Sequence, residues 1–202
     1  MTKISNVSTV SVEIPYEHGG PKAGWGGQSW NKLSILLVKV ETQDGYTGWG
    51  EGFSYNCRPA VRAAVESMIA PVVIGRDAGD ILGISRDMQQ NLHLFGRYGI
   101  TIFALSALDI ALWDIAGKRA GIPLHRLMGG AARTHVPGYA SLLKYGDPDL
   151  VGQNVLKALN DGYDAIKIHE TTVPAVAASR EAAGDGTPLM VDTNCPWTPE
   201  QA

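Results

Sequence analysis

Cysteine is scarce in this 202-residue sequence, which contains only Cys57 and Cys195. Two cysteines so far apart form neither a disulfide framework nor a closely spaced metal-binding pair. Residues 1–6 also lack the apolar segment of a secretory signal. These absences favour a cytoplasmic, reducing location.

Long apolar runs and an excess of one charge are absent as well. The longest apolar stretches, such as residues 33–38, are far shorter than the roughly 20 residues that span a bilayer. The formal net charge is −3, both signs are interspersed, and there is no basic stripe. We therefore expect neither a membrane nor a nucleic acid as a partner. Hydrophobic residues make up 45% of the chain, which is typical of a globular protein with a buried core.

Strand patterns dominate the beginning of the chain. They cover residues 4–14, 33–42 and 46–51. In the first strand, Val10, Val12 and Ile14 share one face, which predicts a half-buried strand. The Asp44-Gly45 pair between the other two strands is a strong hairpin signal. The pattern predicts a three-stranded antiparallel meander.

Helical periodicity follows in three segments. These are residues 59–71, 81–95 and 100–119. Pro71 is expected to end the first helix. The third helix is apolar nearly all round, which predicts burial on most sides, and Gly121 with Pro123 marks its end.

After about residue 131, strands and helices alternate. The predicted order is strand 136–141, helix 147–162, strand 165–169, helix 173–183 and strand 189–192. Such alternation with short connections is typical of parallel α/β folds. It does not distinguish a (β/α)8 barrel from a doubly wound sheet. However, the first of these strands lacks the G-x-G-x-x-G motif of dinucleotide-binding folds.

Polar residues at the ends of these strands are the candidates for chemistry, because sites in parallel α/β folds gather there. Lys167 and His169 lie two residues apart and therefore share one face of their strand. Asp192 ends the next strand and suits a hard cation such as Mg²⁺, and Asn194 follows it. Without further context, the first two residues would also fit a solvated surface pair, and Asp192 would fit a helix or turn cap.

These residue types suit the removal of a proton alpha to a carboxylate. A second negative charge develops on the substrate in that step, and a divalent cation stabilises it while a lysine or histidine takes the proton. A neighbouring cation and desolvation both lower the pKa of a lysine, so Lys167 is a candidate base as well as a candidate electrostatic group.

The third predicted helix and its exit carry a family resemblance. Residues 104–118 read ALSALDIALWDIAGK, followed by Pro123-Leu124 and by LMGG at 127–130. This stretch closely resembles a signature of the mandelate racemase/muconate lactonizing enzyme family of the enolase superfamily. Its Asp114 and Lys118 lie one helical turn apart and are expected to form a structural ion pair rather than to act in catalysis.

The resemblance implies a fold and a domain division. An α+β capping domain, made of the three-stranded antiparallel meander plus helices, is expected over residues 1–130. The beginning of a (β/α) TIM-type barrel, with its first three β/α units, is expected over residues 131–202. Family members commonly assemble through the cap, so we also expect a homo-oligomer.

The resemblance also implies roles by position. Lys167 and His169 occupy the places of the Lys-x-Lys motif of the family, and Asp192 that of the first of three acidic Mg²⁺ ligands. Asn194 matches a polar position that contacts metal or substrate. His169 departs from the commonest base of the family, which is lysine, although a histidine can still abstract a proton.

Two loops, at residues 16–30 and 53–57, resemble the capping loops that close over substrate in this family. Their aromatic and hydrogen-bonding side chains are candidate substrate-binding residues, with packing or surface exposure as the alternative. They are Tyr16, His18, Trp25, Trp30 and Tyr55. This mixture favours a polar substrate with several hydroxyl groups.

The implied activity is Mg²⁺-dependent abstraction of the proton alpha to a carboxylate, with an acid-sugar dehydratase as the first hypothesis. A racemase or epimerase of the same family is the second. A barrel has eight strands, about 250 residues in all, and only three strands are expected here. The remaining acidic ligands and the opposing acid/base group would then lie beyond Ala202. A third hypothesis is therefore a truncated fragment that is inactive without the missing strands.

Overall fold

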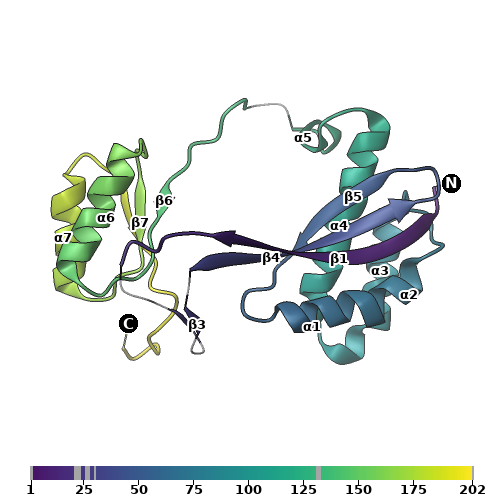
Figure 1. The fold of residues 1–202 in the computed structure, drawn as a ribbon, viewed down its shortest axis with the longest axis horizontal. Helices are drawn as coiled ribbons and strands as arrows, with labels where there is room; N and C mark the ends of the chain where they lie inside the picture. The colour runs from purple at the N-terminus through teal and green to yellow at the C-terminus, as the bar shows by residue number, and fades with distance from the viewer. Residues whose placement is uncertain (1, 21–23, 26–27, 30, 131–132, 202) are drawn as a thin grey trace. The chain divides into compact units, whose positions relative to one another are not determined.

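The chain forms two compact units in the computed structural model (Figure 1). The structure describes residues 2–20, 24–25, 28–29, 31–130 and 133–201. The first unit comprises Met1–Ile14 and Leu33–Ala132, and the second comprises Pro15–Lys32 and Arg133–Ala202. The segment after Ile14 thus groups with the second unit, while the domain boundary at residue 130 stays a prediction.

The first unit contains a three-stranded sheet with the strand order β1-β4-β5 (Figure 1). Its strands are β1 (Ile4–Pro15), β4 (Lys32–Thr42) and β5 (Thr47–Gly52). β4 and β5 run antiparallel, with Leu36 opposite Gly52. In the turn between them, Gly45 has a φ of 89° and donates its N–H to the carbonyl oxygen of Thr42 at 3.0 Å. The predicted meander and its hairpin are confirmed.

The buried positions of β1 differ from the prediction. Ile4 and Val7 are buried, whereas Val10 and Ile14 are 38% and 47% exposed. Apolar residues alternate strictly only from Val10 to Ile14, whereas the core of this unit includes Ile4 and Val7 from the N-terminal part of the strand. The periodicity therefore identified the strand correctly, but of its three predicted positions only Val12 is partly buried.

Pro71 does not end the first helical segment, contrary to the prediction. This segment consists of α1 (Arg58–Ala63), the π-helical η1 (Ala64–Ile69) and α2 (Ala70–Val73). A proline inside a regular α-helix lacks one N–H and clashes with the carbonyl four residues earlier. The wider π-helical turn directly before α2 changes that spacing, so Pro71 lies in the first turn of a new α-helical segment.

The helix that carries the family signature forms the centre of the first unit. The remaining helices here are α3 (Ile81–Asn91), η2 (His93–Phe95), α4 (Ile100–Ala120) and α5 (Leu124–Leu127). In α4, Leu108 and Leu112 are fully buried, whereas Ile110 is 45% exposed, so burial is extensive but not complete around the helix. Gly121 has a φ of 67° and ends α4 in a left-handed cap, as predicted.

By length and composition alone, α4 is apolar enough to cross a membrane, contrary to the prediction that no segment reaches that length. Half of its apolar window is buried inside the protein, and its leucines belong to the core of the first unit. These features are typical of the central helix of a folded domain.

Helix α4 packs directly against strand β5 because two positions of that strand are glycines. A Cβ at Gly48 or Gly50 would clash with a backbone carbonyl oxygen of α4, that of Ala111 or Ala107 respectively. A side chain of the helix also provides a partner for one backbone N–H at the edge of β5, since Trp49 N donates to Asp114 Oδ2 at 2.9 Å. The predicted ion pair between Asp114 and Lys118 is present at 2.7 Å.

The second unit contains a three-stranded parallel sheet with the order β6-β7-β8. Its strands are β6 (Ala140–Ser141), β7 (Ile166–Ile168) and β8 (Leu189–Val191), and its helices are α6 (Pro148–Asn160) and α7 (Val173–Ala183). A small antiparallel ribbon, β2 (Gly24–Trp25) with β3 (Gln28–Ser29), also belongs to this unit. The predicted β-α-β-α-β alternation is present, although β6 is shorter than expected, and Val136, its expected first residue, is 82% exposed.

Candidate functional site

Strand β7 places two polar side chains opposite its buried face. Ile166 and Ile168 are fully buried in the core of the second unit. The side chains of Lys167 and His169, which alternate with them, retain 19% and 14% exposure. The period-two pattern therefore puts an ammonium group and an imidazole on one face at the C-terminal end of the strand.

Asp192 joins both of these residues from the end of the neighbouring strand β8. Lys167 Nζ donates to Asp192 Oδ2 at 3.1 Å, and His169 Nδ1 lies 2.7 Å from the backbone carbonyl oxygen of Asp192. Asn194 completes the group, since its backbone N–H donates to Asp192 Oδ1 at 3.1 Å. Four predicted site residues thus form one connected cluster, which we call the strand-end cluster.

The hydrogen bond to a carbonyl oxygen fixes the tautomer of His169. A carbonyl oxygen only accepts hydrogen bonds, so Nδ1 must carry the proton in the neutral ring. Nε2 then holds a free lone pair that can take a proton. Asn194 Nδ2 is placed 3.0 Å from the same Nδ1, and two N–H donors cannot pair, so a protonated Nδ1 requires the Asn194 amide to be turned with its oxygen toward the ring.

The environment of Asp192 favours its ionised form. The backbone N–H of Asn194, followed by the ammonium group of Lys167, lowers the pKa of the Asp192 carboxyl below its ordinary value. Mg²⁺ prefers oxygen ligands, and an ionised carboxylate at a strand end is of the right type. Among the residues that the structure describes, however, no three His, Cys, Asp or Glu side chains gather closely enough to hold a metal ion. Asp192 fits one ligand of a divalent cation, not a complete site.

Two further residues, which the sequence analysis did not predict, adjoin the cluster. Lys167 Nζ lies 5.9 Å from the ring centroid of Tyr139, at the outer limit of a cation–π contact. Glu170, the residue after His169, is fully buried. Nothing local in the sequence points to Tyr139. Continuing the alternation from Ile168 would have placed the carboxylate of Glu170 on the buried face.

The beginning of the first candidate loop rests on the second unit. The His18 ring meets the edge of the Tyr145 ring, with their centroids 5.3 Å apart. Asn154 Nδ2 on α6 donates to the carbonyl oxygen of Gly19 at 2.8 Å. Both ring nitrogens of His18 are buried without a hydrogen-bond partner among the described residues. Burial raises the pKa of Tyr16. His18 and Tyr16 both belong to the second unit, which also contains the strand-end cluster.

The structure gives less information on the other three candidates for substrate binding. Trp25 lies in β2, and Trp30 is outside the described residues. Tyr55 belongs to the first unit, where its ring centroid is 6.5 Å from that of Phe53. Their roles stay predictions.

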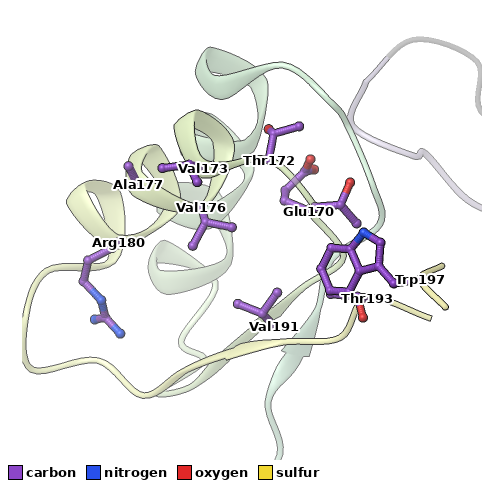
Figure 2. A pocket seen from close by; sticks show the side chains of 10 residues that line it. Glu170, Thr172, Val173, Val176, Ala177, Arg180, Val191, Thr193 and Trp197 are labelled. Carbon is purple, nitrogen blue, oxygen red and sulfur yellow. The ribbon is translucent and has the colours of Figure 1, made fainter. Parts of the chain in front are cut away.

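A cavity of about 350 Å³ lies between α7 and β8 (Figure 2). Val173 and Val176 line it from the helix, and Val191 lines it from the strand. Val191 pairs with Ile168, so it faces the buried side of the sheet, opposite to Lys167. The cavity is therefore separate from the strand-end cluster.

Comparison with known proteins identifies the family. A family model described as the mandelate racemase / muconate lactonizing enzyme N-terminal domain matches residues 25–129, which is just over half of the chain. This region includes α4, whose sequence carries the resemblance.

Three relatives with named activities extend the match beyond that region. Arabinonate dehydratase of Saccharolobus solfataricus is 32% identical, over 87% of this chain and 49% of its own. The 3,6-anhydro-alpha-L-galactonate cycloisomerase of Streptomyces coelicolor is 38% identical, over 84% of this chain and 49% of its own. L-talarate/galactarate dehydratase of Salmonella typhimurium is 34% identical, over 85% of this chain and 45% of its own. The chain spans about half the length of the relatives that it matches.

Solved structures give the same result for the fold. The 3,6-anhydro-D-galactonate cycloisomerase from Zobellia galactanivorans superposes with a TM-score of 0.82 at 25% identity, over 98% of this chain and 53% of that chain. A member of the enolase superfamily from Polaromonas sp. JS666 superposes with a TM-score of 0.82 at 28% identity, over 97% of this chain and 53% of that chain. The predicted fold, a capping domain followed by the beginning of a β/α barrel, is confirmed. This chain belongs to the mandelate racemase/muconate lactonizing enzyme family of the enolase superfamily.

Proposed function

We propose that the full-length protein removes the proton alpha to the carboxylate of a sugar acid in a Mg²⁺-dependent reaction and acts as an acid-sugar dehydratase. The observation that carries this proposal is the strand-end cluster, in which the free Nε2 of His169 shares a strand face with the ammonium group of Lys167. The dehydratases among the relatives, two of which are described above, support the choice of reaction and substrate class.

The difficulty of this reaction is electrostatic. Removing the proton converts a carboxylate into an enediolate that carries two negative charges, and positive groups placed in advance lower the barrier. Lys167 supplies one such charge, and its 19% exposure keeps it partly shielded from water. Asp192, held ionised by its neighbours, is the ligand that we assign to Mg²⁺. When bound, Mg²⁺ supplies further positive charge to the substrate carboxylate.

His169 is the base in this proposal. Its Nδ1 proton is committed to the Asp192 carbonyl oxygen, so the lone pair that can accept the alpha proton is on Nε2. The same hydrogen bond stabilises the imidazolium that forms when that proton arrives, because the carbonyl dipole faces the positive ring. Lys167 then acts as the electrostatic group rather than as the base.

A second candidate is cycloisomerisation, which the Streptomyces coelicolor relative at 38% identity favours. The two outcomes differ in the product, because a dehydratase releases one water and a cycloisomerase does not. A racemase or epimerase would also conserve the atoms of the substrate but would invert one stereocentre.

The test is to incubate the full-length protein with Mg²⁺ and a panel of sugar acids in deuterium oxide. NMR follows exchange of the alpha proton, and mass spectrometry follows the product. We expect exchange together with the loss of one water for at least one acid, and none after removal of Mg²⁺ with a chelator. Turnover without water loss would favour a cycloisomerase or an epimerase. A protein that exchanges the alpha proton of no acid would contradict the proposal.

The isolated 202-residue chain is a further arm of this experiment. Its described residues contribute one carboxylate to the strand-end cluster, so we expect no exchange from this chain alone. Exchange by the isolated chain at rates typical of enzymes would show that Asp192 and its neighbours suffice.

A further inference from the structure

Glu170 is a buried carboxylate whose position calls for an explanation. The burial alternation of β7 continues past the strand, with Ile166, Ile168 and Glu170 all fully buried. Glu170 therefore lies on the apolar side of the sheet, opposite to Lys167 and His169. Burying a carboxylate is costly unless hydrogen bonds replace its lost contacts with water.

Backbone amides of a distant loop provide these hydrogen bonds. Tyr145 N donates to Glu170 Oε1 at 2.7 Å, and Gly146 N donates to Oε2 at 3.1 Å and to Oε1 at 3.3 Å. Gly146 has a φ of 74°, which favours glycine and allows two successive N–H groups to converge on one anion. The two amides lie in the loop between β6 and α6, so Glu170 fastens that loop to the end of β7.

Among the described residues that line the cavity, no side-chain cation donates a hydrogen bond to the Glu170 carboxylate. Arg180 is the one cation there, and its guanidinium donates to the carbonyl oxygens of Gly184 and Thr187. Figure 2 shows the carboxylate of Glu170 pointing away from Val191 and from Arg180. A second contact strengthens the attachment of the loop, since Lys144 Nζ donates to Thr171 Oγ1 at 2.9 Å.

We propose that Glu170 is a positioning residue for His169, a role that rests on the function proposed above. Glu170 is covalently adjacent to His169, and fastening its side chain fixes the direction in which the backbone leaves β7. That direction holds the imidazole where Nδ1 meets the Asp192 carbonyl oxygen and Nε2 stays free. The role is geometric: it depends on an acceptor oxygen at the right reach and not on a negative charge.

This role separates two conservative substitutions. Glu170→Gln keeps the length of the side chain and one acceptor oxygen, whereas Glu170→Asp keeps the charge but shortens the side chain by one methylene. In the full-length protein, we expect the Gln variant to retain kcat for alpha-proton exchange within about threefold of wild type. We expect the Asp and Ala variants to lose about 10²-fold in kcat with a smaller change in KM, because a displaced base loses its near-attack geometry.

Two NMR measurements test the mechanism apart from turnover. Hydrogen exchange at the amide of Tyr145 should be slow in wild type and in Glu170→Gln, whose remaining oxygen can still accept from it, and at least about tenfold faster in Glu170→Ala, because the acceptor is gone. The amide of Gly146 should be slow in wild type and faster in Glu170→Ala. Nitrogen-15 spectra of His169 should show one tautomer in wild type and in Glu170→Gln and a mixture in Glu170→Ala. Glu181→Ala, which removes an exposed carboxylate from α7, is the matched control and should change neither signal.

The outcomes distinguish this inference from the function on which it rests. A wild-type protein without exchange on any acid would contradict the proposed function. Wild-type exchange with unchanged kcat in Glu170→Ala, or unchanged protection at Tyr145 and Gly146, would overturn the positioning role alone. An active Asp variant beside an inactive Gln variant would also overturn it, because charge rather than geometry would then be decisive. If Glu170→Ala fails to fold, the comparison of Gln with Asp still decides.

Discussion

The ammonium group of Lys167 donates a hydrogen bond to the carboxylate of Asp192 at 3.1 Å, between the C-terminal ends of two neighbouring parallel strands. The register that pairs Lys167 with Met190 and Ile168 with Val191 brings the ends of β7 and β8 level. A cation assigned to the substrate and a carboxylate assigned to a metal thus neutralise each other in this structure. Each is expected to change partner when metal and substrate bind.

Replacing Lys167 with methionine should remove the charge and keep most of the volume. We expect alpha-proton exchange by the full-length protein to fall about 10²–10³-fold, the cost of losing one pre-placed electrostatic group. The pKa of Asp192 should rise as well, although the Asn194 N–H, its largest influence, remains. Exchange rates and a carbon-13 titration of Asp192 measure both effects. Lys157→Met, which removes an exposed ion pair with Asp161 on α6, is the control. Exchange within threefold of wild type would exclude Lys167 from the reaction.

The lowered pKa of Asp192 makes a prediction about stability and pH. Because its folded-state pKa lies below the ordinary value of 3.8, the ionised carboxylate favours the folded state. This contribution is fully present above pH 3.8 and is lost as the pH falls through the folded-state pKa. In the presence of a chelator, the stability advantage of wild type over Asp192→Asn should therefore be constant near neutral pH and shrink below about pH 4. Urea unfolding at a series of pH values measures it. An advantage that grows on acidification would refute this assignment.

The hydrogen bond from His169 Nδ1 to the Asp192 carbonyl oxygen predicts both a tautomer and a mutant phenotype. Nitrogen-15 NMR of the neutral ring should show protonated Nδ1 and unprotonated Nε2. His169→Asn should lower alpha-proton exchange by about 10²–10⁴-fold, because an amide cannot take the proton. His125→Asn replaces an exposed histidine of the first unit and should leave exchange unchanged. Observation of the opposite tautomer would remove the reason for choosing Nε2 as the base.

Local patterns predicted much of this fold because the physics behind them is local. The Asp44-Gly45 turn, the Gly121 cap and the shared face of Lys167 and His169 each depend on residues only a few positions apart. The apolar sequence of α4 similarly required a buried helix, and its signature indicated the family.

The errors arise where distant segments decide the outcome. Val10 has the periodicity of a buried residue but is exposed, because the core includes only the beginning of β1. Pro71 looked like the end of a helix, but a π-helical turn before it allows the helical segment to continue. The burial of Glu170 follows from the alternation of β7, but its partners could not be predicted, because Tyr145 and Gly146 lie 25 and 24 residues away and use backbone amides, which leave no trace in a sequence pattern.

The glycine at position 50 offers the sharpest test of the packing in the first unit. A Cβ there would clash with the carbonyl oxygen of Ala107, a backbone atom of α4 that cannot rotate away. We expect Gly50→Ala to lower the free energy of unfolding by about 2–3 kcal/mol, as overpacking typically does. In Gly79→Ala, the nearest atom to the new Cβ would be Asp77 Oδ1 at 3.4 Å, an ordinary contact, so this control should stay within about 0.5 kcal/mol of wild type. Urea denaturation of both variants gives the comparison. Equal stability of Gly50→Ala and wild type would mean that α4 stands farther from β5 than the structure places it.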